Sequence, residues 1–368
     1  MTRDDRVATN PLTNEQLVVR EAINNLVDSA RLDVLRALAE QTRTPAAINA
    51  QGVVARQTAS DHLARFTDRG LTKPVAEQCG YELTAGGKIT LEALETCLDV
   101  LDCEQLACLT RSTHALDVLD HLATGSTRPH EFAKMGADAP SRSTVQRLLN
   151  MFEAQGWSST SGGTHRITAE GQTVLDAYND LALSIEQVVE KAPWLQRLDQ
   201  CRSDLPVQAL ADAKVVVSSP DSPGLVVLAA LNLCDSQFSQ FRALTSIYNP
   251  PLFNAYNELL ERGLPGEAIV DQSVYQELHE DGLQHFLDDT EFADFDIGWL
   301  EEELTLGIGL YDDRKVAIGA YNQTGAADHI AMLISTNQTV VDWAIDLYNR
   351  YWEQAHRKTE RTPEAVSG

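Results

Sequence analysis

The sequence predicts a multidomain α+β chain, in which two copies of a unit with three helices and a β-hairpin precede a C-terminal domain of alternating strands and helices. The segment "LDVLRALA" at 32–39 is nearly repeated as "LDVLDHLA" at 116–123, which is 84 positions later. After Pro206 the pattern changes to short apolar strands that alternate with helices. The length of 368 residues accommodates two or three domains of ordinary size.

The repeat continues beyond these eight residues. The segment "LTAGG" at 83–87 matches "ITAEG" at 167–171 at the same offset of 84, and "TASDHLARFTDRGL" at 58–71 matches "TVQRLLNMFEAQGW" at 144–157 at an offset of 86. Gaps that fall between matched elements are typical of a duplicated fold, because loops tolerate insertions. The expected domains are residues 15–105, 106–200 and 206–357, with flexible tails at 1–14 and 358–368.

Each repeat has the element order of a winged helix, which is a form of helix-turn-helix. In the first repeat an apolar stripe at helical spacing predicts a helix over 29–40, and Pro45 begins a second helix. A third helix ends at Gly70, which provides a left-handed cap. Two short strands follow, and a closing helix is expected after Gly87, with equivalent elements in the second repeat.

The third helix of a helix-turn-helix unit enters the DNA groove, where Arg, Gln, Asn, Ser and Thr contact base edges and phosphates. Because Asp61 repels phosphate, the second repeat is expected to read bases and the first to position the backbone. In the second repeat Arg142, Gln146 and Arg147 are expected to face outward, with Leu148, Leu149 and Phe152 toward the core. The candidate DNA contacts are Arg56, Gln57, Thr58, Ser60, His62, Arg65 and Lys88 in the first repeat, and Ser141, Arg142, Ser143, Thr144, Gln146, Arg147, Asn150 and Arg166 in the second.

The charge balance is strongly acidic, with 29 Lys and Arg against 54 Asp and Glu and a net charge of −25. Residues 205–368 hold 26 of the acidic and only 9 of the basic side chains, whereas the windows 43–73 and 128–147 carry local positive excesses of three and two. Many carboxylates with only 7 Lys are typical of a halophilic, salt-rich cytosol. The sequence has no apolar run of about 18 residues and no signal peptide, so a cytoplasmic protein without membrane association is expected.

The closing helices carry apolar residues at heptad-like spacing, which is typical of helix pairing. In the second repeat these residues are Val174, Tyr178, Leu181, Ile185 and Val188, over the segment from Gly171 to Pro193. Two alternatives remain open for this stripe: packing within the chain, or the interface of a homodimer.

The C-terminal domain is expected to be α/β. Its acidic segment "DDTEFADFDIGWLEEEL" at 288–304 is interpreted as a solvated connector. Strands are expected at 211–220, 241–247 and 267–272 with three more across 306–336, and helices at 223–234, 250–263 and 340–357 with a polar helix after 272.

No catalytic constellation is found, so no enzymatic activity and no cofactor are expected. The segment "GIGLYD" from Gly307 has two of the three glycines of a dinucleotide-binding turn, but a strand follows it, so that function is discounted. The six cysteines have no metal-ligand spacing, so no metal site is expected. A small-molecule pocket is expected in this domain, with candidate residues Tyr248, Tyr311, Tyr321 and Trp343.

Three segments resemble a known family: "YNPPLFNAYNELLERG" at 248–263, "GLYDDRKVAIGAYN" at 309–322 and "WAIDLYNRYW" at 343–352. They are similar to archaeal winged-helix transcription regulators whose effector half is named for a methanogenesis regulator. The resemblance covers residues 206–357 and implies a haloarchaeal regulator whose C-terminal domain senses a ligand or mediates oligomerisation. Relatives in this family usually carry one winged helix, so the duplication departs from their pattern.

The residues and the resemblance together predict a regulator that binds double-stranded DNA as a homodimer and responds to a small-molecule effector. One alternative is a winged-helix factor that binds another protein of the transcription or chromosome machinery. An enzyme built on the C-terminal half is a second alternative.

Overall fold

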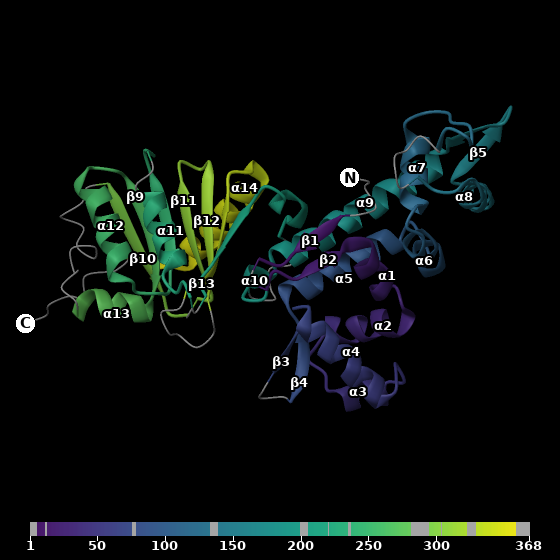
Figure 1. Cartoon of the computed structure of the whole chain (residues 1–368). Helices are drawn as coiled ribbons and strands as arrows, with labels where there is room; N and C mark the ends of the chain where they lie inside the picture. Colours follow the sequence, from purple (N-terminus) through teal and green to yellow (C-terminus); the bar gives the residue numbers. More distant parts are fainter. Residues whose placement is uncertain are drawn as a thin grey trace, which may run out of the picture. The chain divides into compact units, whose positions relative to one another are not determined.

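The protein is described from a computed structural model, which covers residues 6–11, 13–75, 79–132, 139–198, 205–219, 221–234, 237–280, 294–302, 304–321 and 329–357. The chain forms two compact units, one of residues 1–10 and 14–190 and the other of residues 11–13 and 191–368 (Figure 1). Each unit is described separately below.

The N-terminal unit contains both repeats. Its helices are α1 (Val19–Leu26), α2 (Ser29–Ala39), α3 (Pro45–Ala50), α4 (Arg56–Asp68), α5 (Ala85–Leu98), α6 (Cys103–Arg111), α7 (Ala115–Ala123), α8 (Arg142–Ala154) and α9 (Ala169–Glu190). Its strands are β1 (Val7–Thr9), β2 (Gln16–Val18), β3 (Thr72–Val75), β4 (Gly80–Leu83), β5 (Ser158–Ser161) and β6 (Thr164–Ile167), which pair in sequence order as three antiparallel hairpins.

The first repeat has the predicted order of three helices, a hairpin and a closing helix. Side chains cap its helices: Asp28 accepts a hydrogen bond from the amide of Ala30, and Thr44 accepts one from Ala47 before the proline that starts α3. The apolar stripes then meet in a core in which Leu35, Ile48, Leu63 and Leu83 are fully buried.

The second repeat reproduces this arrangement in register. In the first repeat Arg43 and Tyr81 exchange backbone hydrogen bonds, so the chain after α2 joins the hairpin; Thr127 and His165 do the same in the second repeat. Both members of the second pair lie 84 positions after those of the first. Most of the second helix expected in this repeat falls on residues 133–138, outside the described residues.

The closing helices begin two residues before the predicted glycines, at Ala85 and Ala169, which corrects the expected boundary. The reason is a threonine cap. Thr84 accepts a hydrogen bond from the amide of Gly87 at 3.0 Å and donates one to the carbonyl of Gly70 at 2.6 Å. Thr168 makes the same two bonds to Gly171 and Gly156, at 3.0 and 2.7 Å, so both repeats close with one design.

Three features of this unit were not expected from the sequence. The segment 1–14 was assigned to a flexible tail, but its residues 7–9 form β1, because Val7 pairs with Val18 and Ala8 is buried. The helices α1 and α6 also escaped sequence interpretation. Both are short, and they are equivalent: α6 begins 84 positions after α1, which is the offset of the repeat, so each begins its own repeat ahead of the three predicted helices.

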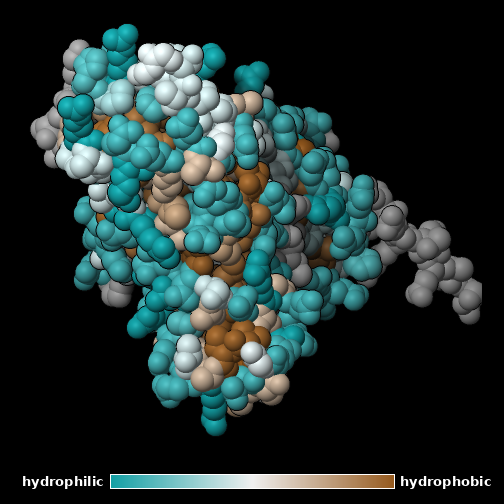
Figure 2. Space-filling view, turned by 90° about the vertical axis from the view of Figure 1, so that its right-hand side faces the viewer, coloured by the Kyte–Doolittle hydropathy of each residue, from teal (hydrophilic) through white to brown (hydrophobic). Residues whose placement is uncertain are grey.

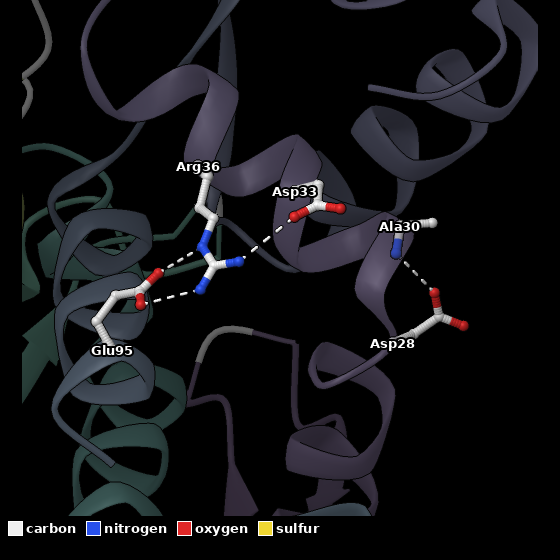
Figure 3. Close-up of polar contacts among 5 residues, drawn as sticks. All are labelled: Asp28, Ala30, Asp33, Arg36 and Glu95. Atoms are coloured by element: carbon white, nitrogen blue, oxygen red, sulfur yellow. Dashed lines mark hydrogen bonds and ion pairs between the residues drawn. The ribbon is translucent and has the colours of Figure 1, made fainter. Parts of the chain in front are cut away.

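The guanidinium of Arg36 links α2 of the first repeat to the closing helix α5. Its Nε and Nη2 atoms lie 2.7 and 3.0 Å from the two carboxylate oxygens of Glu95, and its Nη1 lies 3.4 Å from Asp33 (Figure 3). The pair is bidentate but half-exposed, so its expected contribution is below about 1 kcal/mol. The guanidinium of Arg36 is therefore bound within the first repeat.

The heptad-like stripe of the second closing helix is filled within the chain. Val174, Tyr178, Leu181, Ile185 and Val188 are all at most 6% exposed, and α9 packs against α5, α1, α7 and β1. Of the two alternatives for this stripe, the structure shows packing within the chain, so the stripe is unavailable as a dimer interface.

The C-terminal unit contains one mixed sheet of eight strands in the order β14-β10-β9-β8-β11-β12-β13-β7. The strands β8, β9 and β10 are parallel to one another, and the other neighbours are antiparallel. The elements are α10 (Ala192–Leu195), the 3-10 helix Val207–Leu210, β7 (Lys214–Val217), α11 (Leu225–Cys234), β8 (Phe241–Thr245), α12 (Pro250–Glu261), β9 (Gly266–Asp271), α13 (Gln272–Glu280), β10 (Phe295–Leu300), β11 (Leu306–Tyr311), β12 (Lys315–Tyr321), β13 (His329–Ser335), α14 (Gln338–Gln354) and β14 (His356–Arg357).

This unit has three layers. Side chains of α11, α12 and α13, such as Val226, Phe253 and Val274, form a buried cluster with Phe241 and Met332 on one face of the sheet. The helix α14 packs on β11 and β12 from the other face (Figure 1). The strands and helices predicted after residue 206 are therefore present within the described residues, and the dinucleotide-like glycines lie inside a strand.

One interpretation of this domain is wrong. The acidic segment 288–304 was expected to be a solvated connector, but its residues 295–300 form β10, which pairs in parallel with β9 and antiparallel with β14. Alternating Phe295, Ile297 and Trp299 side chains pack onto the buried cluster, and this burial outweighs the local acidity. Within the described residues, every helix is too short or too polar to cross a membrane.

Candidate nucleic-acid interface

The helix α8 presents one polar face and one buried face. Val145, Leu148, Leu149 and Phe152 are at most 1% exposed. Arg142, Gln146, Arg147 and Asn150 are exposed, so the orientation predicted for this helix is confirmed. The exposed row beside Arg147 includes Ser143 and carries no carboxylate until Glu153 near the end of the helix.

The start of α8 is fixed by Ser141. Its hydroxyl accepts a hydrogen bond from the amide of Thr144 at 3.2 Å and lies 2.9 Å from the hydroxyls of Ser143 and Thr144. This cap satisfies one amide at the helix N-terminus, and the remaining free amides favour an anion. Ser141 and Thr144 therefore hold the helix end, while Ser143 is exposed beside it.

The polar side chains of this face differ in whether they have a hydrogen-bond or ion-pair partner. Gln146 donates a hydrogen bond to Asn150 at 2.9 Å, so these two side chains hold each other. Within the described part of the chain, Arg142 and Arg147 make neither a hydrogen bond nor an ion pair through their side chains. An exposed guanidinium without a carboxylate partner is available for phosphate or guanine.

The hairpin that follows α8 is narrow and uncharged apart from Arg166. Gly162 and Gly163 adopt φ values of 59° and 76°, which suit the tight turn between β5 and β6. Arg166 is exposed on β6 opposite Ser159, whereas His165 is buried and hydrogen-bonded to Thr160 at 2.9 Å. Arg166 is therefore the one Lys or Arg side chain that this hairpin presents.

The equivalent face of α4 is different. Arg56, Gln57 and Arg65 are exposed, and Thr58, Ser60 and His62 are half-buried. Asp61 and Asp68 are also exposed, and the amide of Gln57 donates to Asp61 at 2.9 Å. Two carboxylates on this face weaken its attraction for phosphate.

In the hairpin of the first repeat, formed by β3 and β4, the positive charge is also balanced by a carboxylate. Lys73 on β3 lies 3.1 Å from the carboxylate of Glu82 on β4. Lys88 is half-buried on α5, and its charge opposes the burial that raises the pKa of Glu92 one turn later. The predicted contacts of the first repeat therefore lie beside carboxylates, whereas those on α8 have no carboxylate partner in the part of the chain that the structure describes.

A small basic cavity lies beside α4. It has a volume of about 40 Å³ and is lined by Asn25, Leu26, Arg31, His62, Arg65, Phe66 and Arg69. Burial lowers the pKa of His62, and the nearby charge of Arg31 adds to this effect. Arg31 and Arg69 were not among the predicted residues, although Arg69 follows His62 and Arg65 at helical spacing.

The predicted ligand residues do not form one site. Tyr311 lines a cavity of about 90 Å³ between the sheet and the helices α11 and α12. Tyr248 packs on Phe253 near the start of α12, and Trp343 is buried in α14 on the opposite side of the sheet. Tyr321 ends β12, but its side chain lies outside the described part.

Other residue sets give no further site. No group of three His, Cys, Asp or Glu that could hold a metal occurs among the residues that the structure describes. The surface drawn in Figure 2 is mostly hydrophilic, with small hydrophobic patches between polar side chains.

Comparison with known families supports both halves of this description. Residues 20–106 and again 103–189 match the family described as the HVO_A0261 N-terminal domain. One family that matches twice confirms the duplication. Residues 230–354 match the family described as the middle domain of the methanogenesis regulatory protein FilR1, which supports the resemblance expected for this half.

Among solved structures, the archaeal chromatin protein TrmBL2 is 13% identical, with a TM-score of 0.33, over 67% of this chain and 92% of that one. NucT from Helicobacter pylori is 12% identical, with a TM-score of 0.33, over 40% and 98%. Nuc, a phospholipase D family member from Salmonella typhimurium, is 14% identical, with a TM-score of 0.28, over 40% and 98%. Likenesses this low do not define a shared activity. No curated protein matches the chain.

Proposed function

We propose that the protein is a DNA-binding transcription regulator, with two tandem winged helices and a C-terminal domain that senses an effector. The observation that carries this proposal is the exposed face of α8, where, among the described residues, Arg142 and Arg147 have no hydrogen-bond or ion-pair partner and the exposed row carries no carboxylate before Glu153. The match to a methanogenesis regulatory protein supports the regulatory role.

The second repeat is the proposed reader of the DNA sequence. Its helix α8 supplies Arg147, Gln146 and Asn150 for base edges, and Arg142 and Arg166 for phosphates. The first repeat has the same scaffold, but its carboxylates suit it to positioning the duplex rather than to reading it. We place the regulator in the cytoplasm of a haloarchaeon, as a homodimer without enzymatic activity.

The test compares three purified variants in binding to genomic fragments enriched by chromatin immunoprecipitation. Arg147→Ala should weaken binding by about 1–3 kcal/mol, or roughly tenfold to a hundredfold, if it contacts a base. Arg65→Ala on α4 should have a smaller effect. Arg111→Ala is the matched control, since Arg111 is exposed on α6 and its loss changes the net charge equally.

The alternative, a winged-helix factor that binds a protein, gives a different result. In that case Arg147→Ala and Arg111→Ala should bind duplex DNA equally weakly, and a fragment that is enriched through the partner protein should not be bound by the purified chain. Unchanged affinity of the Arg147 variant for an enriched fragment would also contradict the assignment of α8 as the reading helix.

A further inference from the structure

The floor of the C-terminal cavity consists of residues that have almost no side chain. Ala268, Ala243, Gly309 and Ala317 lie opposite one another on the four neighbouring strands β9, β8, β11 and β12. Gly307 and Gly319 form a second such pair beside them. A row of small residues across the middle of a sheet leaves space that helices packed on that sheet do not fill.

The walls of the cavity are large and apolar. Phe241, Phe253, Phe295 and Ile297 surround the floor, and Val226 of α11 covers it. The ring of Phe241 lies 5.1 Å from that of Tyr256 in a tilted arrangement and 6.3 Å from that of Phe295 in a stacked one, so these walls support one another. About 90 Å³ therefore stays open inside an otherwise buried cluster.

Two phenol hydroxyls meet at this cavity. The hydroxyl oxygens of Tyr256 on α12 and Tyr311 on β11 are 3.4 Å apart, which is a long hydrogen bond. A Cβ atom on Gly309 would lie 3.0 Å from the Tyr311 hydroxyl, so this glycine gives the phenol its position over the strand. The third polar lining group, Thr245, already bonds to the backbone of Ile247.

No charged side chain is among the described lining residues. An anionic or cationic ligand would lose its hydration there without gaining a counter-charge, which costs several kcal/mol. Burial raises the pKa of Tyr311 above its usual range, and the neighbouring Cys234, which is also its hydrogen-bond partner, acts in the same direction, so the hydroxyl is neutral as it ordinarily is at physiological pH. The site therefore selects against charge.

We infer that this cavity is the effector site, and that its ligand is a small, uncharged, largely apolar molecule with one hydrogen-bonding oxygen that replaces the long contact between Tyr256 and Tyr311. The inference deepens the proposed effector role and rests on it for its biological meaning. A cavity of about 150 Å³ holds benzene, so the smaller volume of about 90 Å³ suits a ligand smaller than benzene, with about four non-hydrogen atoms.

The test uses three probes of about four non-hydrogen atoms on the full chain, without DNA: 2-propanol, 2-chloropropane and acetate. Isothermal titration calorimetry or a thermal shift reports binding. The alcohol should bind about two- to tenfold more tightly than 2-chloropropane, as one hydrogen bond allows, and acetate should not bind.

Variants then assign the binding to this cavity. Tyr256→Phe removes one hydroxyl and should abolish most of the preference for 2-propanol over 2-chloropropane. Tyr275→Phe is the matched control, because Tyr275 lies on α13 against Trp299 and is outside the described lining. Ala317→Leu fills the floor of the cavity and should weaken the binding of both uncharged probes. If Ala317→Leu does not fold, Tyr256→Phe alone tests whether the probes bind in this cavity.

Three results would overturn the inference: no binding of either uncharged probe up to its solubility, equal binding of acetate, or an unchanged preference in Tyr256→Phe. DNA binding measured in the same preparations keeps the two proposals distinct. A chain that binds DNA but no probe would refute the cavity alone, and a chain that binds the alcohol but no DNA would refute the regulator alone.

Discussion

Gly171 lies so close to the carbonyl of Trp157 that a Cβ atom on the glycine would be 2.1 Å from that oxygen. The equivalent distance in the first repeat, from Gly87 to the carbonyl of Leu71, is 2.0 Å. In both repeats the first turn of the closing helix thus packs directly against the backbone of the residue that precedes the first strand of the hairpin. This contact explains why "TAGG" and "TAEG" share their last glycine.

A Gly171→Ala variant should therefore be destabilised. The oxygen in its path belongs to the backbone and cannot rotate away, so we expect a loss of about 1–3 kcal/mol in the free energy of unfolding. Chemical denaturation measures this. Gly224→Ala is the matched control, because no atom lies within 4 Å of a Cβ placed there; equal stability of the two variants would contradict the prediction.

DNA binding should depend only weakly on salt. Phosphate contacts release counterions, so affinity normally falls steeply as salt rises. Here the residues from 205 onward carry 26 acidic against 9 basic groups, and salt screens their repulsion from the duplex. Titrating one fragment between about 0.2 and 2 M KCl gives the slope. A slope like that of a protein with six to ten phosphate contacts would refute this prediction.

Acidification should destabilise the N-terminal unit through His62. Burial and the charges of Arg31 and Arg65 lower the pKa of His62 below 6.5, and they outweigh Asp28 and Asp61, which act in the opposite direction. The unfolded chain then binds the proton more readily, so stability falls as pH drops from above 6.5 through the lowered pKa. His62→Gln should lose less stability between neutral and acid pH than the unchanged chain. Equal losses in the two proteins would show that His62 is not responsible.

The cysteines should differ sharply in reactivity. Burial raises the pKa of Cys97 to about 12, so at pH 8 only about one thiol in ten thousand is ionised. Cys79 is exposed in the turn between β3 and β4. Brief treatment with iodoacetamide followed by mass spectrometry should find Cys79 alkylated and Cys97 unmodified until denaturant is added. Early modification of Cys97 would contradict its burial.

The sequence predicted the repeated scaffold because its determinants are local. Helical spacing, the proline at 45 and the glycines at 70 and 156 act within one turn of the backbone, and they recur in both copies. The strand β10 was missed for the opposite reason. Its stability comes from pairing with β9 and β14 and from burial of Trp299, and neither partner is visible in an acidic segment read alone.

Of the two candidate sites, one could be predicted from the sequence and the other could not, for the same reasons. The exposed face of α8 follows from its periodicity, so Arg142 and Arg147 could be placed from sequence. The cavity could not, because its floor comes from four strands whose order in the sheet differs from their order in the chain. Of the four aromatic residues proposed for it, Tyr311 lines it, and Tyr256, which completes the pair of hydroxyls, was missed.

The packing of α5 against α9 has a geometric consequence. These closing helices belong to different repeats, yet they lie side by side within one compact unit. The capping threonine of each closing helix also donates a hydrogen bond to the glycine that ends the third helix of the same repeat, from Thr84 to Gly70 and from Thr168 to Gly156. The separation between α4 and α8 is then set by the protein and not by the duplex. If both helices contact DNA, they require a fixed spacing between the two contacted segments of the duplex. Inserting a few base pairs between these segments should prevent α4 and α8 from binding the same duplex at once.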